Sequence, residues 1–312
     1  MAQTRKIVSK PKLLGKNWVM AVDPFSDLDM KPLLQLVKPL AESSGAQLHA
    51  IYIMAPAALN WTGDFSGPWR KKYVPIAEAK LKEFFAGTGI PTSVVNCKDS
   101  GQSAVVKSLL GHAKKMKADR LVISTHARKG LERLTMGSFA ETVIVASKVP
   151  VLVVNPSQRL PKAVRKILVP TDLSKKNAKF VTEVAAYAKR LGAEVVLFHK
   201  QPDPLDPIVQ QGVYSLGGGW VSVQNFMEEE STERTRQIAK IETELRRKDI
   251  TVSHVYDSSP AGLIESINKA ASDSGSDLIS VMTSSGKWSA GILGSVARGL
   301  VRNAKRPLLV QR

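Results

Sequence analysis

Two kinds of hydrophobic pattern alternate along this chain. Short runs of mostly β-branched apolar residues lack a polar alternation, as is typical of parallel strands covered on both faces. Between them lie stretches with apolar residues at helical spacing, such as residues 31–45 and 178–192, which end at Gly45 and Gly192. Glycine after a helix favours the left-handed C-cap conformation. Alternating strands and helices predict βαβ crossovers and a doubly wound parallel sheet.

This order of elements occurs twice, about 150 residues apart. "NWVMAVD" and "RKILVPTD" are apolar runs that end at Asp23 and Asp172. "AQLHAIYI" parallels "AEVVLFHK", "PTSVVNC" parallels "ITVSHVY", "ADRLVIST" parallels "SDLISVMT", and "SKVPVLVV" parallels "AKRPLLVQ". Helical stretches such as residues 75–89 and 223–249 fill the intervals. A repeat of this length predicts two equivalent α/β domains with five strands each.

The repeat predicts the domain boundaries. Residues 1–16 form a basic arm, 17–154 the first domain, 155–164 a linker with two prolines, and 165–312 the second domain. Two loops, 54–69 and 201–220, are rich in proline and glycine. Long loops of this kind serve as surface insertions or as contact surfaces, and the pattern leaves that choice open.

Composition narrows the class of protein. Hydrophobic residues make up 43% of the chain, and no apolar run is long enough for a membrane helix. The single cysteine, Cys97, excludes an internal disulfide, and the first residues lack the apolar core of a secretion signal. These features predict a cytoplasmic protein without membrane association. The net charge of +18 raises nucleic acid as a partner, but aromatic residues are few and no RNA- or DNA-binding signature is present, which argues against specific recognition.

The motifs resemble those of the universal stress protein family, in its tandem two-domain form. The resemblance rests on "VPTDLS" at 169–174, on the element order, and on Gly-Ser pairs that open the last helices before "P-[VL]-L-V" strands. It implies two flavodoxin-like domains with strand order 3-2-1-4-5, and a ligand edge at the carboxyl ends of the strands. It also implies that the fifth strands of paired domains meet, here within one chain, as an internal pseudo-dimer.

The resemblance also implies an ATP site in members that carry G-x2-G-x9-G-[ST] after the fourth strand. The glycines give the backbone access to phosphates, and the last pair presents helix amides. In the first half, Ser124 and Ala127 replace the first two glycines, although Gly137, Ser138 and Asp23 remain. Because Ala127 adds a Cβ where phosphate would pass, a structural helix start is expected there.

The second half keeps Pro170, Thr171 and Asp172 at the end of its first strand. Gly286 stands at the second glycine and Gly294-Ser295 at the third, but Thr283 replaces the first glycine and the interval is two residues shorter. Lys200, aligned with Ala50, is expected where binders line the adenine pocket, and would there oppose a neutral base or rotate out. Asp172 is alternatively a turn or helix cap.

No catalytic or metal-binding signature accompanies these motifs. The five histidines have no ligand spacing, and His49 and His199 are expected to share one structural position. The sequence therefore predicts a non-enzymatic stress-response module with degenerate nucleotide sites and no metal. One alternative is a protein that binds ATP or another adenine nucleotide, mainly in its second domain, and hydrolyses it slowly or not at all. A third is a basic scaffold for nucleic acid or acidic partners, and a homodimer with four domains is a further expectation.

Overall fold

The computed structural model describes residues 16–26, 29–55, 67–97, 99, 101–124, 136–201, 223–283 and 293–311. The first half contains β1 (Asn17–Ala21), α1 (Lys31–Ser43), β2 (Gln47–Met54), α2 (Gly67–Phe84), β3 (Thr92–Asn96), α3 (Gln102–Lys115), β4 (Arg120–Ser124), α4 (Met136–Ala146) and β5 (Val151–Val154). The second half contains β6 (Lys166–Pro170), α5 (Lys175–Leu191), β7 (Glu194–Lys200), α7 (Val223–Arg246), β8 (Val252–Asp257), α8 (Leu263–Asp273), β9 (Leu278–Met282), α9 (Ser295–Asn303) and β10 (Leu308–Gln311).

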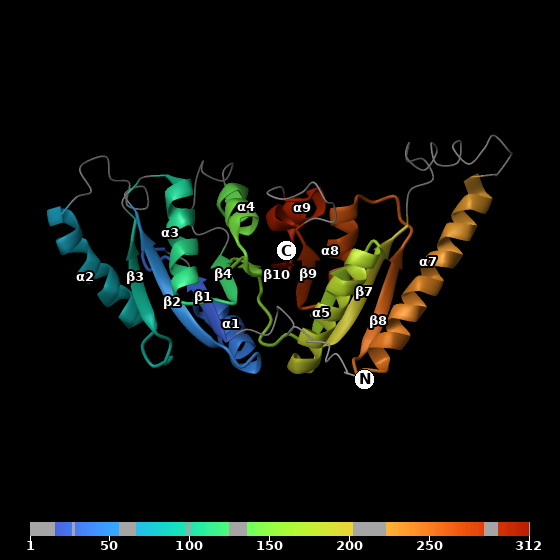
Figure 1. Cartoon of the computed structure of the whole chain (residues 1–312), viewed down its shortest axis with the longest axis horizontal. Coiled ribbons are helices and arrows are strands. Elements are labelled where there is room, and N and C mark those ends of the chain that lie inside the picture. Colours follow the sequence, from blue (N-terminus) through green and yellow to red (C-terminus); the bar gives the residue numbers. More distant parts are fainter. Residues whose placement is uncertain are drawn as a thin grey trace, which may run out of the picture.

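The ten strands form one sheet in the order β3-β2-β1-β4-β5-β10-β9-β6-β7-β8. Each half is parallel and has the predicted order 3-2-1-4-5, and the halves join where β5 and β10 pair antiparallel. The predicted fold and the pairing of the fifth strands are therefore confirmed. In Figure 1, α4 and α9 lie side by side at the centre of the molecule, and α2 and α7 lie at its two ends.

Two hydrophobic layers cover the sheet because successive strand residues point to opposite faces. Trp18 and Met20 pack on the face of α1, α2, α5 and α7, while Val19 packs on the face of α3, α4, α8 and α9. All three side chains are fully buried. The inner strands thus lack a solvent face, which explains why their sequences read as continuous apolar runs, whereas the edge strands β3 and β8 are half-buried.

Most predicted helix ends agree with the structure. Gly192 is the C-cap of α5 in the left-handed conformation, and Gly45 follows α1 with φ +69°. One helix start was wrong: α2 begins at Gly67, within the predicted loop 54–69, and contains Pro75, which we expected near its first turn. Of the other predicted loop, 201–220, only Gln201 lies within the described residues. Within the described part of the chain, no helix is long and apolar enough to cross a membrane.

Candidate nucleotide-binding edge

In the second half, the ends of β6 and β9 and the start of α9 form the edge that the sequence predicts. The β6–β9 ladder ends at Leu168 and Ile279, so the remaining residues of β6 have no ladder partner on β9. The corresponding β1–β4 ladder of the first half continues to Ala21 and Ile123. Pro170, the counterpart of Ala21, has no amide hydrogen to continue such a ladder. The two central strands of the second half are neighbours at the switch in strand order, and open α/β sheets bind ligands at the carboxyl ends of such strands.

The loop after β6 is held by its own side chains. The Thr171 hydroxyl accepts a hydrogen bond from the Leu173 amide at 3.0 Å, and Asp172 Oδ1 accepts one from the Ser174 amide at 2.9 Å. Ser174 then caps α5 by accepting from the Asn177 amide. Asp172 thus makes the predicted turn, and its exposed side chain still faces solvent at this edge, beyond Pro170.

The start of α9 lies next to the end of β9. The Gly294 amide donates to the Thr283 carbonyl at 2.6 Å, which brings two of the predicted site residues into contact. Gly294 is the N-cap of α9 and has no side chain to cap it, so no side-chain cap to the first-turn amides, among them that of exposed Ser295, is found within the described residues. Amides of this kind, at the positive end of the helix dipole, favour an anion.

Strand pairing agrees with the predicted alignment of the fourth strands. Ser124 pairs with Val154 in the first half, and Met282 pairs with Gln311 in the second, so Met282 is the counterpart of Ser124. Thr283, predicted at the first glycine of the motif, directly follows β9 and lies one residue beyond that counterpart. Gly286, predicted at the second glycine, lies outside the described residues.

Lys200 occupies the end of β7, and its predicted counterpart was wrong. The β1–β2 and β6–β7 registers align Lys200 with Ile53, not with Ala50. Its ammonium donates to Asp257 Oδ2 at 2.9 Å, to the Ser259 carbonyl at 2.7 Å and to Ser266 Oγ at 3.1 Å. All three acceptors lie on β8, on the turn that follows it or on α8. The lysine is therefore directed toward β8 and α8. This agrees with the predicted alternative in which its side chain rotates out of the adenine pocket.

Asp257 completes this network, which the sequence did not reveal. Burial acts to raise the pKa of Asp257, but hydrogen bonds from Ser266, Lys200 and Ser259 outweigh it and hold that pKa well below its usual range. The carboxylate thus stays charged and neutralises Lys200. Because Asp257 follows Lys200 by 57 residues, only the pairing of β7 with β8 brings them together.

The two histidines that we expected at one position lie at different ones. The same registers align His199 with Tyr52, and His49 with Val196. His199 is buried, and its Nδ1 lies 2.9 Å from the Thr171 carbonyl oxygen. This contact ties β7 to the first residue of the candidate loop, a supporting role that the motif alone could not predict.

Different side chains occupy the corresponding edge of the first half. Asp23 Oδ1 accepts from the Phe25 amide at 3.0 Å, in the same turn as Asp172. The Phe25 ring packs on Tyr52 with centroids 5.6 Å apart, and Lys80 lies 4.8 Å over the Phe25 ring. Gly137 and Ser138 lie in the first turn of α4, as predicted, while residues 125–135, which include Ala127, are outside the described part.

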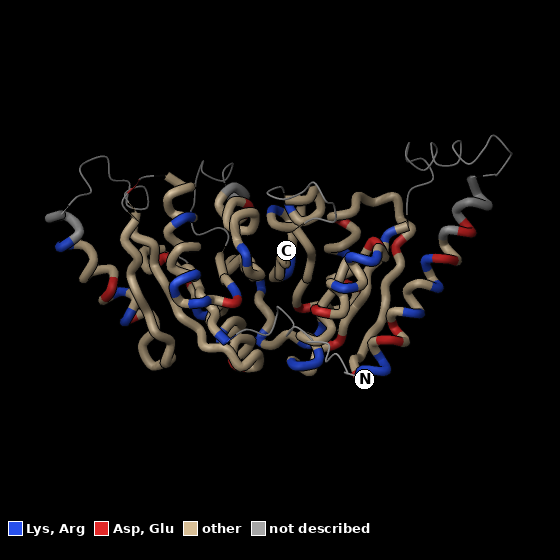
Figure 2. The backbone as a smooth tube through the Cα atoms, viewed as in Figure 1, with Lys and Arg blue, Asp and Glu red and all other residues tan. Residues whose placement is uncertain are grey.

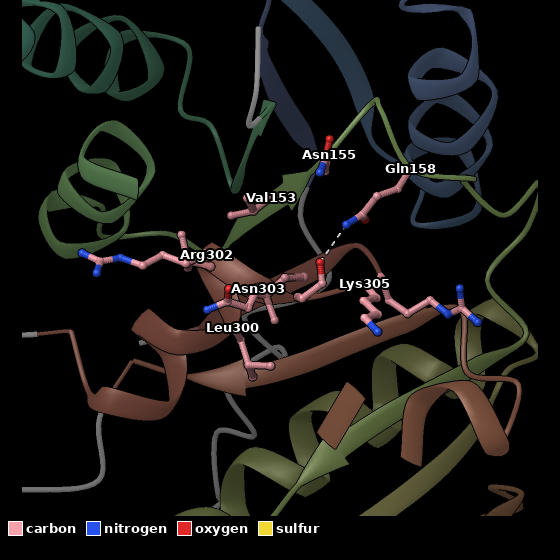
Figure 3. A pocket seen from close by; sticks show the side chains of 11 residues that line it. Val153, Asn155, Gln158, Leu300, Arg302, Asn303 and Lys305 are labelled. Atoms are coloured by element: carbon pink, nitrogen blue, oxygen red, sulfur yellow. Dashed lines mark hydrogen bonds between the residues drawn. The ribbon is translucent and has the colours of Figure 1, made fainter. Parts of the chain in front are cut away.

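A separate hollow of about 120 Å³ lies at the junction of the halves (Figure 3). It is lined by the end of β5, by the linker residue Gln158 and by the turn between α9 and β10. The Gln158 side-chain amide donates to the Ala304 carbonyl across it at 2.8 Å. Because this turn precedes β10, the hollow lies at the opposite end of the second-half strands from Thr283. The described residues hold no cluster of three or more metal-ligating side chains.

Known proteins resemble both halves of the chain. Residues 16–155 and 163–312 each match the universal stress protein family. A universal stress protein from Archaeoglobus fulgidus DSM 4304 matches 95% of this chain and 96% of its own, with a TM-score of 0.64 and 15% identity. A functionally unknown protein, PA1789 from Pseudomonas aeruginosa PAO1, matches 97% of this chain and 94% of its own, with a TM-score of 0.60 and 12% identity. At such identities, this likeness is one of fold.

Shorter proteins match one half. A universal stress protein solved in complex with cAMP matches 48% of this chain and 98% of its own, with a TM-score of 0.32 and 15% identity. A comparison with curated proteins gave no match.

Proposed function

The chain belongs to the universal stress protein family, with two of its domains in tandem, and from this premise we propose a non-enzymatic binding module of the stress response. Its second domain holds one adenine nucleotide, and its first domain serves as a partner with a degenerate site. One observation carries this proposal: the start of α9, where the N-cap Gly294 has no capping side chain, lies beside Thr283 at the switch in strand order.

The phosphates of the nucleotide bind at the start of α9. The first-turn amides, which have no acceptor within the helix, and the helix dipole both attract anions. Gly294 has no side chain, so the backbone is open to a phosphate group, and Ser295 adds a hydroxyl at the first helical position. The spacing from Gly286 to Gly294 is shorter than in the family motif, so we expect fewer phosphate contacts than in members with the full loop.

The nucleoside end binds along the end of β6. Asp172 presents a carboxylate there, and its turn with the Ser174 amide fixes the direction of that group. A carboxylate at this edge suits a ribose hydroxyl, which donates a charge-assisted hydrogen bond. Lys200 does not oppose the base, because Asp257 neutralises its ammonium and draws it toward α8.

The nucleotide acts as a regulatory ligand and is not turned over. Asp172 accepts the Ser174 amide in its own turn, and Asp257 is bound to Lys200. A general base needs a carboxylate or imidazole placed to take a proton from the attacking water, and in this proposal Asp172 instead binds the ribose. Nucleotide binding therefore serves to stabilise one arrangement of the second domain.

The experiment compares two equivalent aspartates by calorimetric titration of the full chain with ATP. Asp172→Ala and Asp23→Ala each remove one turn hydrogen bond, from the Ser174 and Phe25 amides, so their structural costs match. Asp172→Ala is expected to weaken binding by about tenfold or more, the usual effect of losing a charged hydrogen bond. Asp23→Ala should leave the affinity unchanged.

Two results would contradict the proposal. Wild-type protein that binds neither ATP nor AMP would eliminate nucleotide binding altogether. An Asp23→Ala variant that loses as much affinity as Asp172→Ala would show that the first domain is not degenerate.

A further inference from the structure

The contacts between the two halves differ in chemistry on the two sides of the junction. The connection from Gly137 to Val151 has the same length as that from Gly294 to Leu308, and β5 and β10 hold equivalent places in the sheet. Glu141 of α4 is therefore the counterpart of Arg298 of α9, and Val145 is the counterpart of Arg302. The equivalent positions 141 and 298 thus carry opposite charges, and Arg302 is matched by an uncharged valine.

These opposite charges meet across the junction. Glu141 Oε1 accepts from Arg302 Nε at 2.6 Å, and Glu141 Oε2 lies 3.3 Å from Arg298 Nε. The Glu141 side chain is only 15% exposed, so its charge is poorly solvated and depends on the two arginines. Two first halves would place Glu141 against Glu141, and two second halves would place Arg298 and Arg302 against a second pair of arginines.

A second asymmetric contact lies on the opposite face of the sheet. Arg120 of β4 is 1% exposed, and its Nη1 donates to the Tyr187 hydroxyl of α5 at 2.7 Å. Its guanidinium lies between two aromatic rings, 4.1 Å from the centroid of Trp18 and 4.5 Å from that of Tyr187. Cation–π contacts of this kind are strongest when the cation is desolvated.

The other half has apolar residues at these positions. The register of β4 and β9 gives Leu278 as the counterpart of Arg120, and the equal spacing to Gly45 and Gly192 gives Leu40 as the counterpart of Tyr187. In a pair of first halves, Arg120 would be buried against Leu40, which has no acceptor and no ring. Trp18 belongs to the first half and would remain, but the buried charge would lose both the hydroxyl and the ring of Tyr187, which is unfavourable.

A third contact joins the carboxyl ends of α1 and α5. Arg190 Nε of α5 donates to the Ser43 carbonyl of α1 at 3.1 Å, and Ser43 is itself the counterpart of Arg190. The ends of these helices carry negative partial charge, which favours the guanidinium. Two second halves would bring two Arg190 side chains to this place.

We propose that this junction is a pairing surface that fits a first half against a second half and rejects pairs of like halves. The partner that it accepts presents α9 arginines and Tyr187, and the surface that receives them presents Glu141 and Arg120. The chain therefore closes on itself as a two-domain unit.

The test reverses charges in the intact chain, so that each variant imitates a rejected pair. Glu141→Arg imitates two second halves. The double substitution Arg298→Glu with Arg302→Glu places carboxylates against Glu141, which is the like-charge contact that two first halves would make. The triple variant with all three substitutions restores opposite charges in the reverse direction. Glu78→Arg on exposed α2 is the control for Glu141→Arg, and Lys71→Glu with Lys72→Glu is the control for the double variant.

The readout is hydrogen exchange of the β5 and β10 amides, which form the antiparallel join, relative to β2 amides within one half. Each imitation should raise β5 and β10 exchange by about tenfold, since like charges in contact open the junction. The triple variant should return close to wild type, and the controls should not differ from it. Glu141→Gln should give an intermediate rise, which keeps the test informative if a reversal prevents folding.

The proposal is overturned if the reversals change exchange no more than their controls. It is also overturned if the triple variant shows the summed damage of its parts, because complementary charge would then have no role in the pairing.

Discussion

At the scale of single residues, the Lys200–Asp257 pair decides what occupies the edge of the second domain. Lys200 has three acceptors, and Asp257 receives hydrogen bonds from Ser266, Lys200 and Ser259. A network satisfied in this way keeps a charged side chain in one orientation. The Lys200 ammonium, which would oppose a neutral adenine if it pointed into the pocket, is thereby held against β8 and α8.

Because the pKa of Asp257 is lowered, the stability that this pair contributes is lost in acid. Because folding lowers the pKa from its ordinary value of 3.8, the carboxylate contributes stability that is fully present above that value and is lost as the pH falls below it. Asp257→Asn removes the titrating carboxylate, so the stability of this variant should depend less on pH. We expect the difference in thermal midpoint between wild type and Asp257→Asn to shrink as the pH is lowered from 6 to 3.

The measurement is thermal unfolding followed by circular dichroism at several pH values in that interval. A difference that stayed constant across the interval would contradict a charged Asp257 as the source of stability. Asp249→Asn, on an exposed carboxylate, is the control for the general effect of removing one negative charge.

Site residues that belong to a local sequence motif could be predicted from the sequence. Contacts between residues that are far apart in the sequence could not. Asp172, Gly294 and Ser295 were identified because strand-end aspartates and helix-opening glycines have local sequence signals. The contact of Arg120 with Tyr187 spans 67 residues and joins two different halves, so no local pattern signals it. The correspondence of Lys200 failed because a strand register depends on pairing partners that the sequence does not display.

At the scale of elements, helix ends determine how the two halves fit together. Both α1 and α5 are followed by glycine in the left-handed conformation, and this could be predicted because few other residues adopt it without strain. The start of α2 could not be predicted in this way. Proline is favourable in the first turn of a helix, so Pro75 suggested a helix start. The structure instead tolerates Pro75 inside the helix.

The two glycines offer a matched pair of substitutions. Gly192→Ala forces alanine into φ +64° with open space around it, and should cost about 1 kcal/mol of unfolding free energy. Gly45→Ala carries the same backbone strain, and its Cβ would lie 2.6 Å from Arg190 Nη2, which displaces the guanidinium that reaches Ser43. Gly45→Ala should therefore cost more.

Urea unfolding of both variants measures the difference. Equal losses would show that the Arg190 contact contributes nothing to stability. In the background of Arg190→Ala, the two glycine substitutions should become equal, because the neighbour that distinguishes them has been removed.

At the scale of the whole molecule, the antiparallel join of β5 and β10 turns two domains into one sheet of ten strands. Figure 2 shows lysines and arginines spread over helices of both halves, with acidic residues between them along α7. Such a distribution explains the high net charge without a single basic stripe of the kind that tracks a nucleic-acid backbone. The repeat predicted this architecture, while the asymmetry between the halves appears only when their contacts are compared.

The two candidate edges also differ, and this difference underlies our central proposal that one half binds a nucleotide and the other half supports it. The most direct measurement is the number of ATP molecules bound per chain at saturation, by calorimetric titration of full-length protein stripped of nucleotide. The account predicts one ATP per chain. Two per chain would contradict it by giving the first domain a working site, and a value of zero would contradict it by removing the nucleotide from the function of this protein.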